Sequence, residues 1–173
     1  MKTVKVEQIL RVAIALLLVA LLGVIYRSFH ERIVGVGDSA PDFTVVADNG
    51  RTVSLDDFGG RLLILNFWAT WCPPCIQEMP SLDELQKRFK DSGVVVLGLS
   101  VDKNEKDYRN LLSKANVSFL TARDPENRIN QEYGTFKFPE TYIISKNGKV
   151  IQKIIGPANW TDDNMVGYVR SLL

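Results

Sequence analysis

The chain opens with a long hydrophobic segment. Residues 12–26 contain no charged side chain, and Ile9 and Leu10 extend the run across Arg11. A helix rises about 1.5 Å per residue, so the resulting run of about 18 to 20 residues is long enough to cross the hydrocarbon core of a bilayer. The Arg11 side chain would then reach the interface. The pattern predicts a single transmembrane anchor in residues 1–32, together with a short cytoplasmic N-terminus and the start of a linker.

Charges around this segment indicate its orientation. The basic side chains before the run slightly outnumber those after it once Glu31 is counted, which favours a cytoplasmic N-terminus. Tyr26 and Arg27 stand where a signal peptidase site would need small residues, which argues for an uncleaved anchor. A cleaved signal and a buried helix of a cytosolic protein remain as alternatives. We expect a single-pass protein of the cytoplasmic membrane, with its domain on the extracytoplasmic, periplasmic side.

Residues 33–173 show the patterning of one folded α/β domain. Continuous apolar runs at 61–68 and 94–101 are typical of strands buried on both faces. Between them, residues 73–90 repeat apolar side chains every three or four positions, which predicts an amphipathic helix. Asn49-Gly50, between two short alternating segments of residues 41–55, predicts an N-terminal β-hairpin.

The second half of the domain adds further predicted elements. They are helices at 105–115, at 125–133 with Pro125 at its start, and at 161–172 capped by Thr161; a short strand at 117–122; and a hairpin of strands 141–145 and 150–155. The full order is a hairpin, then βαβαβα, then ββα. This order predicts an α/β sheet with a parallel centre and an antiparallel hairpin edge.

Composition and charge exclude some functions. At 173 residues the chain has room for one sizeable core, and 46% hydrophobic and 24% charged residues are ordinary values for a folded protein. The net charge is +1, and from Gly35 onward 16 basic and 18 acidic residues give −2. Because no cluster of basic residues is present, the sequence does not indicate nucleic-acid binding.

The two cysteines carry the candidate chemistry. Cys72 and Cys75 stand where the strand at 61–68 gives way to the helix at 73–90. The free N–H groups and partial positive charge of a helix N-terminus stabilise a thiolate, and Pro73 fits the first helical position. Cys75 lies one turn further on the same side. The pattern predicts a redox-active Cys72–Cys75 disulfide with an exposed, nucleophilic Cys72 and a deeper Cys75 that resolves mixed disulfides.

Other uses of these cysteines are weaker hypotheses. A structural disulfide over so short a loop constrains the unfolded chain little. Structural zinc needs four ligands, and the chain offers two cysteines and His30, so we expect no metal and no cofactor. The direction of exchange depends on a redox potential that the sequence does not reveal, so a disulfide-introducing oxidant stays open. An anchored binding or chaperone module with incidental cysteines is the remaining alternative.

A family resemblance adds to this interpretation. The segment FWATWCPPC resembles the active site of the thioredoxin superfamily. WCPPCIQEMP and the preceding APDFTVVADNGRTVSLDDFGGRLLILNFW resemble the membrane-anchored bacterial thiol–disulfide oxidoreductases of the TlpA/ResA/CcmG (DsbE-like) group, over about residues 36–173. The resemblance implies a thioredoxin-like fold, with a central mixed sheet flanked by helices and a central insertion at 103–122. It also implies a protein disulfide reductase that acts on extracytoplasmic substrates, apocytochrome c among them, and is recharged by a membrane electron donor.

The resemblance further implies which residues form the site. Pro139 matches the cis-proline that faces the CxxC pair in these folds, so the backbone of Phe138 would pair with a substrate strand. Asn66 stands where thioredoxin itself has a buried aspartate, and Glu78 matches the glutamate that replaces it as proton acceptor for Cys75. A solvated first-turn glutamate is the alternative for Glu78.

The expected substrate surface combines residues from two segments. Trp71 would cover the surface beside Cys72, where a substrate docks, the alternative being a purely packing role. Glu140 matches the CcmG-like Pro-Glu-Thr pattern and would add acidity there, the alternative being an exposed residue at a strand edge. The predicted substrate-binding residues are Trp71, Pro73, Phe138, Pro139 and Glu140.

Overall fold

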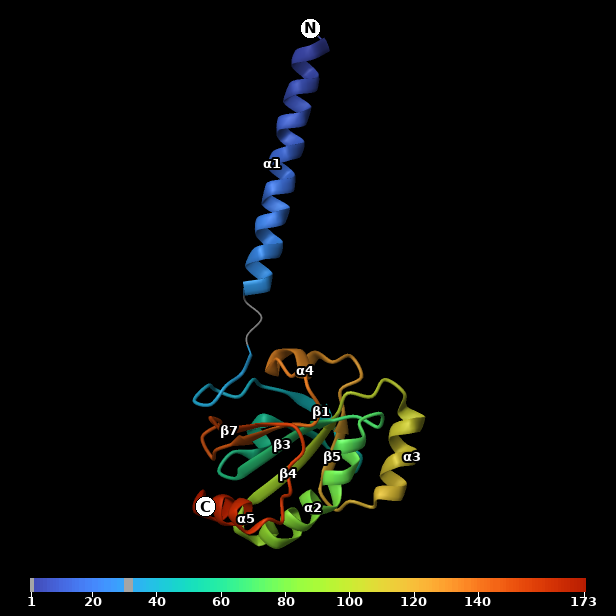
Figure 1. The fold of residues 1–173 in the computed structure, drawn as a ribbon, viewed down its shortest axis with the longest axis vertical. Coiled ribbons are helices and arrows are strands. Elements are labelled where there is room, and N and C mark those ends of the chain that lie inside the picture. Colours follow the sequence, from blue (N-terminus) through green and yellow to red (C-terminus); the bar gives the residue numbers. More distant parts are fainter. Residues whose placement is uncertain (1, 30–32) are drawn as a thin grey trace. The chain divides into compact units, whose positions relative to one another are not determined.

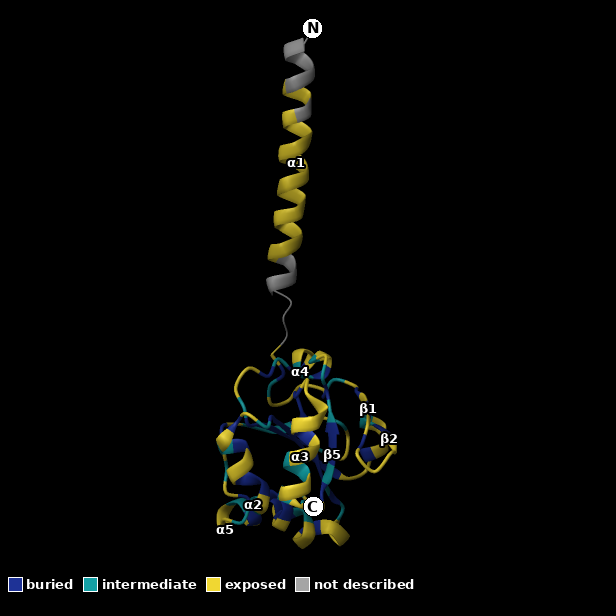
Figure 2. Cartoon of the chain, turned by 90° about the vertical axis from the view of Figure 1, so that its right-hand side faces the viewer, coloured by how far each residue is buried: buried dark blue, intermediate teal, exposed yellow. Residues whose placement is uncertain are grey.

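The computed structural model describes residues 2–29 and 33–173, and the chain separates into two compact units, residues 1–32 and 33–173 (Figure 1). In the first unit, α1 (Lys2–Phe29) is one continuous helix of 28 residues. The side chains of residues 10–25 are all exposed (Figure 2). Among the described residues, no helix combines the length and the hydrophobicity that a membrane span requires.

The second unit is built on a five-stranded sheet in the order β5-β4-β3-β6-β7. Its strands are β3 (Leu62–Trp68), β4 (Val94–Ser100), β5 (Leu120–Arg123), β6 (Glu140–Ile144) and β7 (Val150–Ile155). β3, β4 and β5 run parallel, whereas β6 and β7 run antiparallel to their neighbours. The predicted parallel centre and antiparallel hairpin edge are confirmed.

Two hydrophobic cores lie on opposite faces of this sheet. Alternate residues of β3 divide between them, as the pleat of a strand requires: Leu62 and Ile64 enter one core, and Leu63 and Leu65 the other. The first core is closed by α2 (Pro73–Phe89), α3 (Glu105–Ala115) and α5 (Asp163–Ser171). The second is closed by the hairpin β1 (Thr44–Val46) and β2 (Thr52–Ser54), by the 3₁₀ turn η1 (Leu55–Phe58), and by α4 (Arg128–Tyr133). A second 3₁₀ turn, η2 (Lys90–Ser92), follows α2.

Most predicted elements are present. The N-terminal hairpin forms as predicted, and Gly50 and Gly148 adopt the positive φ values (79° and 72°) that such turns need. The insertion at 103–122 forms α3 and leads into β5, which is the edge strand of the sheet.

The predicted starts of α4 and α5 were wrong. Pro125 lies in a turn before α4, because Asn127 adopts a left-handed conformation and the Asp124 carboxylate accepts hydrogen bonds from the N–H groups of Arg128 and Asn130. Thr161 does not cap α5, since its N–H and hydroxyl both donate to the Asn159 side chain. Asp162 is the cap and accepts from the Asn164 N–H.

The strand expected at 117–122 also begins later, at Leu120. The Asp83 carboxylate of α2 accepts hydrogen bonds from both the N–H and the hydroxyl of Ser118. Residue 118 is therefore tied to α2 instead of pairing with β4.

Candidate active site

Cys72 and Cys75 form a disulfide at the start of α2. Cys72 is the N-cap residue, and its carbonyl oxygen accepts hydrogen bonds from the N–H groups of Cys75 (3.1 Å) and Ile76 (3.3 Å). Pro73 takes the first helical position, as predicted. The pair therefore lies where the helix dipole favours a thiolate.

The expectation of an exposed Cys72 was wrong. Cys72 is 5% exposed and Cys75 is 1% exposed, and both pack in the core with Trp68 and Met79. In the disulfide, the sulfur of Cys72 is bonded to that of the deeper Cys75. Cys72 remains the more accessible of the two.

The loop before Cys72 meets the segment before β6. The Phe138–Pro139 bond is cis, as expected. The Trp71 and Phe138 rings pack edge to face, with centroids 5.8 Å apart. Trp71 is 66% exposed, whereas Pro139 is buried. Pro73 is also exposed, so Trp71 and Pro73 present the accessible surface beside the disulfide.

Glu78 lies one helical turn beyond Cys75 and is 4% exposed, so the alternative of a solvated glutamate is wrong. Its Oε1 accepts a hydrogen bond from the side-chain amide of Asn66 (2.7 Å), and its Oε2 accepts one from the Ala158 N–H (3.0 Å). Burial raises the pKa of Glu78 above the ordinary value for a glutamate, while these two donors act in the opposite direction. A carboxylate with a raised pKa is a stronger proton acceptor.

Asn66 donates two hydrogen bonds from its side-chain amide. Besides Glu78, the amide donates to the Thr141 hydroxyl at 2.9 Å, which links β3 to β6. Asn66 is 2% exposed. Asn66 of β3 is thus a buried hydrogen-bond donor to the Glu78 carboxylate of α2.

Glu140 is fully buried, and the alternative of an exposed strand-edge residue is wrong because β6 lies between β3 and β7. Its Oε1 accepts from the Tyr142 hydroxyl (2.6 Å) and pairs with Lys153 Nζ at 2.8 Å. Oε2 has no hydrogen-bond partner among the described residues. Contrary to the prediction, Glu140 therefore does not form part of the accessible surface beside the disulfide, and its carboxylate is paired within the sheet.

Asp102 is a site residue that the sequence analysis missed. It follows β4 and is 4% exposed. Its carboxylate accepts hydrogen bonds from the Thr70 N–H (2.8 Å), the Thr70 hydroxyl (2.7 Å) and the Ser100 hydroxyl (2.7 Å). Asp102 thus fixes the loop that carries Trp71 and Cys72. The sequence could have indicated this contact, because Thr70 and Asp102 each follow a predicted strand, and the carboxyl ends of neighbouring parallel strands meet at one edge of a sheet.

No group of three or more potential metal ligands is found among the described side chains. His30 lies outside the described residues.

Comparisons with known proteins agree with this geometry. The profile of the AhpC/TSA family matches residues 36–153. The thiol-disulfide oxidoreductase ResA of Bacillus cereus is 34% identical over 165 residues, which cover 94% of each chain. The thioredoxin-like protein YneN of Bacillus subtilis is 38% identical over 147 residues, covering 80% of this chain and 85% of YneN. Among solved structures, a putative thiol:disulfide interchange protein DsbE from Chlorobium tepidum superposes with a TM-score of 0.75 at 29% identity, covering 80% of this chain and 98% of that one.

Proposed function

The chain belongs to the AhpC/TSA family as a thiol–disulfide oxidoreductase of the TlpA/ResA/CcmG group, and on that premise we propose that it reduces disulfides of extracytoplasmic proteins while anchored in the cytoplasmic membrane. The observation that carries the proposal is the Cys72–Cys75 pair at the N-terminus of α2, with the buried Glu78 carboxylate one turn beyond it.

The first step forms a mixed disulfide. The Cys72 thiolate attacks one sulfur of a substrate disulfide, so that the substrate S–S bond breaks and a bond from Cys72 to the substrate forms. The other substrate sulfur leaves as a thiolate and takes a proton from water. The N-terminus of α2 stabilises the attacking thiolate.

The second step releases the product. Cys75 gives its proton to Glu78 and attacks the Cys72 sulfur. The mixed disulfide breaks, the Cys72–Cys75 disulfide forms, and the second substrate sulfur leaves and is protonated. Two electrons have then passed from the pair to the substrate, and a membrane electron donor restores the dithiol.

Substrate binding would use the surface beside Cys72. The Trp71 ring, exposed Pro73 and the backbone of Phe138 next to Pro139 would receive an extended substrate segment by strand addition. Glu140 would contribute indirectly, because its ion pair with Lys153 joins β6, which follows Pro139, to β7.

The anchor and the substrate class rest on sequence features. Residues 12–26 carry no charge and fall within the single helix α1, which supports a membrane anchor with the second unit outside the cytoplasm. Cytochrome c maturation, with apocytochrome c cysteines as substrate, rests on the CcmG-like Pro139-Glu140-Thr141 and on the likeness to a DsbE-type structure.

Substrate trapping tests the proposal. Cys75→Ala expressed in native cells should accumulate a covalent complex through Cys72, visible on a non-reducing gel and lost on adding reductant. The Cys72→Ala/Cys75→Ala double variant should trap nothing. If the Cys75→Ala protein forms no adduct, the resolving role of Cys75 is wrong. For the anchor, the protein should stay with membranes after carbonate extraction, and deletion of residues 2–29 should release it.

A further inference from the structure

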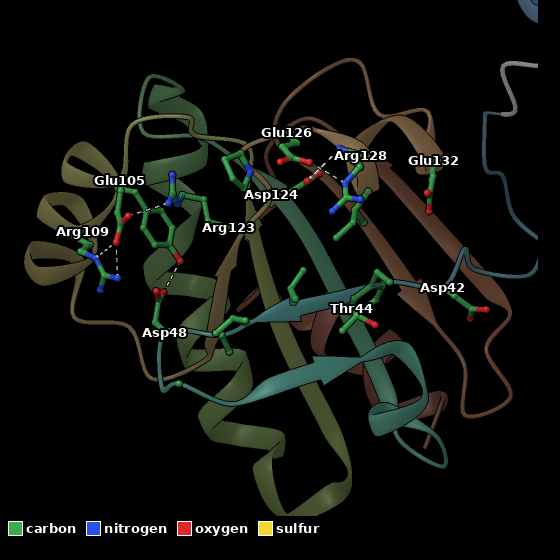
Figure 3. Close-up of a pocket in the computed structure, with 18 residues that line it drawn as sticks. Asp42, Thr44, Asp48, Glu105, Arg109, Arg123, Asp124, Glu126, Arg128 and Glu132 are labelled. Atoms are coloured by element: carbon green, nitrogen blue, oxygen red, sulfur yellow. Dashed lines mark hydrogen bonds and ion pairs between the residues drawn. The ribbon is translucent and has the colours of Figure 1, made fainter.

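A second concave surface lies away from the cysteine pair. It is a groove of about 700 Å³ between β1 on one side and α3, the end of β5 and α4 on the other (Figure 3). No residue from 66 to 80 lines it. The groove is therefore separate from the candidate active site.

One wall of the groove is an open strand edge. β1 pairs with β2 antiparallel, with Thr44 opposite Ser54 and Val46 opposite Thr52. The Leu55 N–H donates to the Phe43 oxygen and the Ala47 N–H to the Arg51 oxygen, so the odd-numbered residues of β1 direct their backbone groups toward β2. The N–H groups of Thr44 and Val46 consequently face the other way, where they have no hydrogen-bond partner among the described residues.

This edge is open because β5 is short. Ala47 pairs with Ala122 in an antiparallel bridge, and the Asp48 N–H donates to the Thr121 oxygen at 2.9 Å. β5 then ends at Arg123, and the chain turns away at residues 124–126. The bridge sets Arg123 opposite Val46, so an added segment that continued along the line of β5 beyond Arg123 would run antiparallel to β1 and meet the free N–H group of Thr44.

The net negative charge of the groove favours a positively charged occupant. Its lining holds six carboxylates and three guanidinium groups, an excess of three negative charges. The arginines pair with two of the carboxylates: Arg109 and Arg123 with Glu105, and Arg128 with Glu126 (Figure 3). Asp42 and Glu132 are exposed at the same surface and have no ion-pair partner among the described residues.

We propose that the groove binds an extended, basic polypeptide segment that adds to the open edge of β1 as an antiparallel strand. Backbone hydrogen bonding to Thr44 supplies affinity, and lysine or arginine side chains near Asp42 and Glu132 supply specificity. This surface does not use Cys72 or Cys75, so its loss leaves the reduction of a small disulfide unchanged. A chain that binds in the groove is held to the protein independently of the mixed disulfide.

The probe for this proposal is a fluorescein-labelled peptide, Lys-Thr-Lys-Val-Lys-Thr-Lys, titrated into the full chain in detergent and followed by anisotropy at low salt. The matched peptide has glutamate in place of lysine. We expect the lysine peptide to bind at least tenfold more tightly. Peptide binding should also slow amide hydrogen exchange at Thr44. Equal binding of the two peptides, or unchanged exchange at Thr44, would overturn the proposal.

Variants separate edge pairing from simple charge attraction. Thr44→Pro removes one free N–H without touching the hydrogen bonds to β2, a position that an edge strand tolerates. It should weaken binding at least tenfold. Thr52→Pro, the same change on the outer edge of β2, should bind within twofold of the unaltered protein. Asp42→Asn/Glu132→Gln, which keeps the backbone intact, should weaken binding at least fivefold. Unaltered binding by Thr44→Pro or by the charge variant would refute the inference.

Discussion

The Asn66 side-chain amide donates a hydrogen bond of 2.7 Å to Glu78 Oε1, and both residues are buried. An aspartate at position 66 would place a second carboxylate within hydrogen-bond distance of Glu78, and two such groups cannot both ionise readily. The acidic group at this site is therefore Glu78 of α2, and Asn66 of β3 supplies the hydrogen-bond donor that orients it.

Glu78→Gln should lower the pKa of the Cys72 thiol in the reduced protein. Once ionised, the carboxylate repels a thiolate that forms on the same helix, and the neutral amide does not. Thiolate absorbance at 240 nm against pH measures the change. Glu84→Gln, which alters an exposed glutamate of the same helix, is the control and should titrate like the unaltered protein. An unchanged titration for Glu78→Gln would remove Glu78 from the mechanism.

Glu78 should also make stability depend on pH. Its folded-state pKa is raised above the ordinary 4.5, so the folded chain retains a proton that the unfolded chain has released. Stability is therefore lost as the pH rises from about 4.5 through the raised pKa, and Glu78→Gln should not show this loss. Urea unfolding over a pH series measures the slope for both proteins. Parallel slopes would show that Glu78 titrates normally.

Asp102→Ala should loosen the loop before Cys72. The change leaves the N–H and hydroxyl of Thr70 without their acceptor, which costs about 1–3 kcal/mol of unfolding free energy. We expect faster amide hydrogen exchange at Thr70 and Trp71 and slower disulfide reduction. Asp56→Ala, at an exposed position, is the control. Unchanged exchange at Thr70 would mean that Asp102 does not hold the loop.

Lys153→Met should destabilise the domain by about 3–5 kcal/mol, because it leaves the buried Glu140 carboxylate without its cation. Lys153→Met/Glu140→Gln removes both charges and should recover most of the loss. Urea unfolding of the single and double variants measures both effects. Equal losses in the two variants would show that the packing of the Lys153 side chain, and not the ion pair, stabilises this region.

Much of the fold was predictable because its signals are local. The apolar runs of β3 and β4 and the period of α2 depend only on neighbouring residues, and α3 has the predicted bounds. The starts of α4 and α5 were missed because several polar side chains stand near each start. Only the folded chain decides that Asp162, and not Thr161, caps α5.

In the candidate site, likewise, the features set by local sequence were predictable, and those set by the fold were not. The position of Cys72 and Cys75 between a strand and a helix follows from the local pattern. The Asp102–Thr70 contact joins segments 32 residues apart, so no local periodicity predicts it. The Lys153–Glu140 pair depends on the register of the β6–β7 hairpin, which the sequence pattern does not determine. The burial of Glu78 likewise depends on the Ala158 N–H, 80 residues away.

Because the three tryptophans differ in exposure, the intrinsic fluorescence of the protein can report on the region around the disulfide. Trp68 and Trp160 are 1% and 0% exposed, whereas Trp71 is 66% exposed and adjoins the disulfide. A dissolved quencher such as acrylamide therefore reaches Trp71 selectively, and a neighbouring disulfide quenches indole emission through electron transfer. Steady-state fluorescence, without any attached dye, can follow the conversion between disulfide and dithiol and the arrival of a polypeptide over the Trp71 ring.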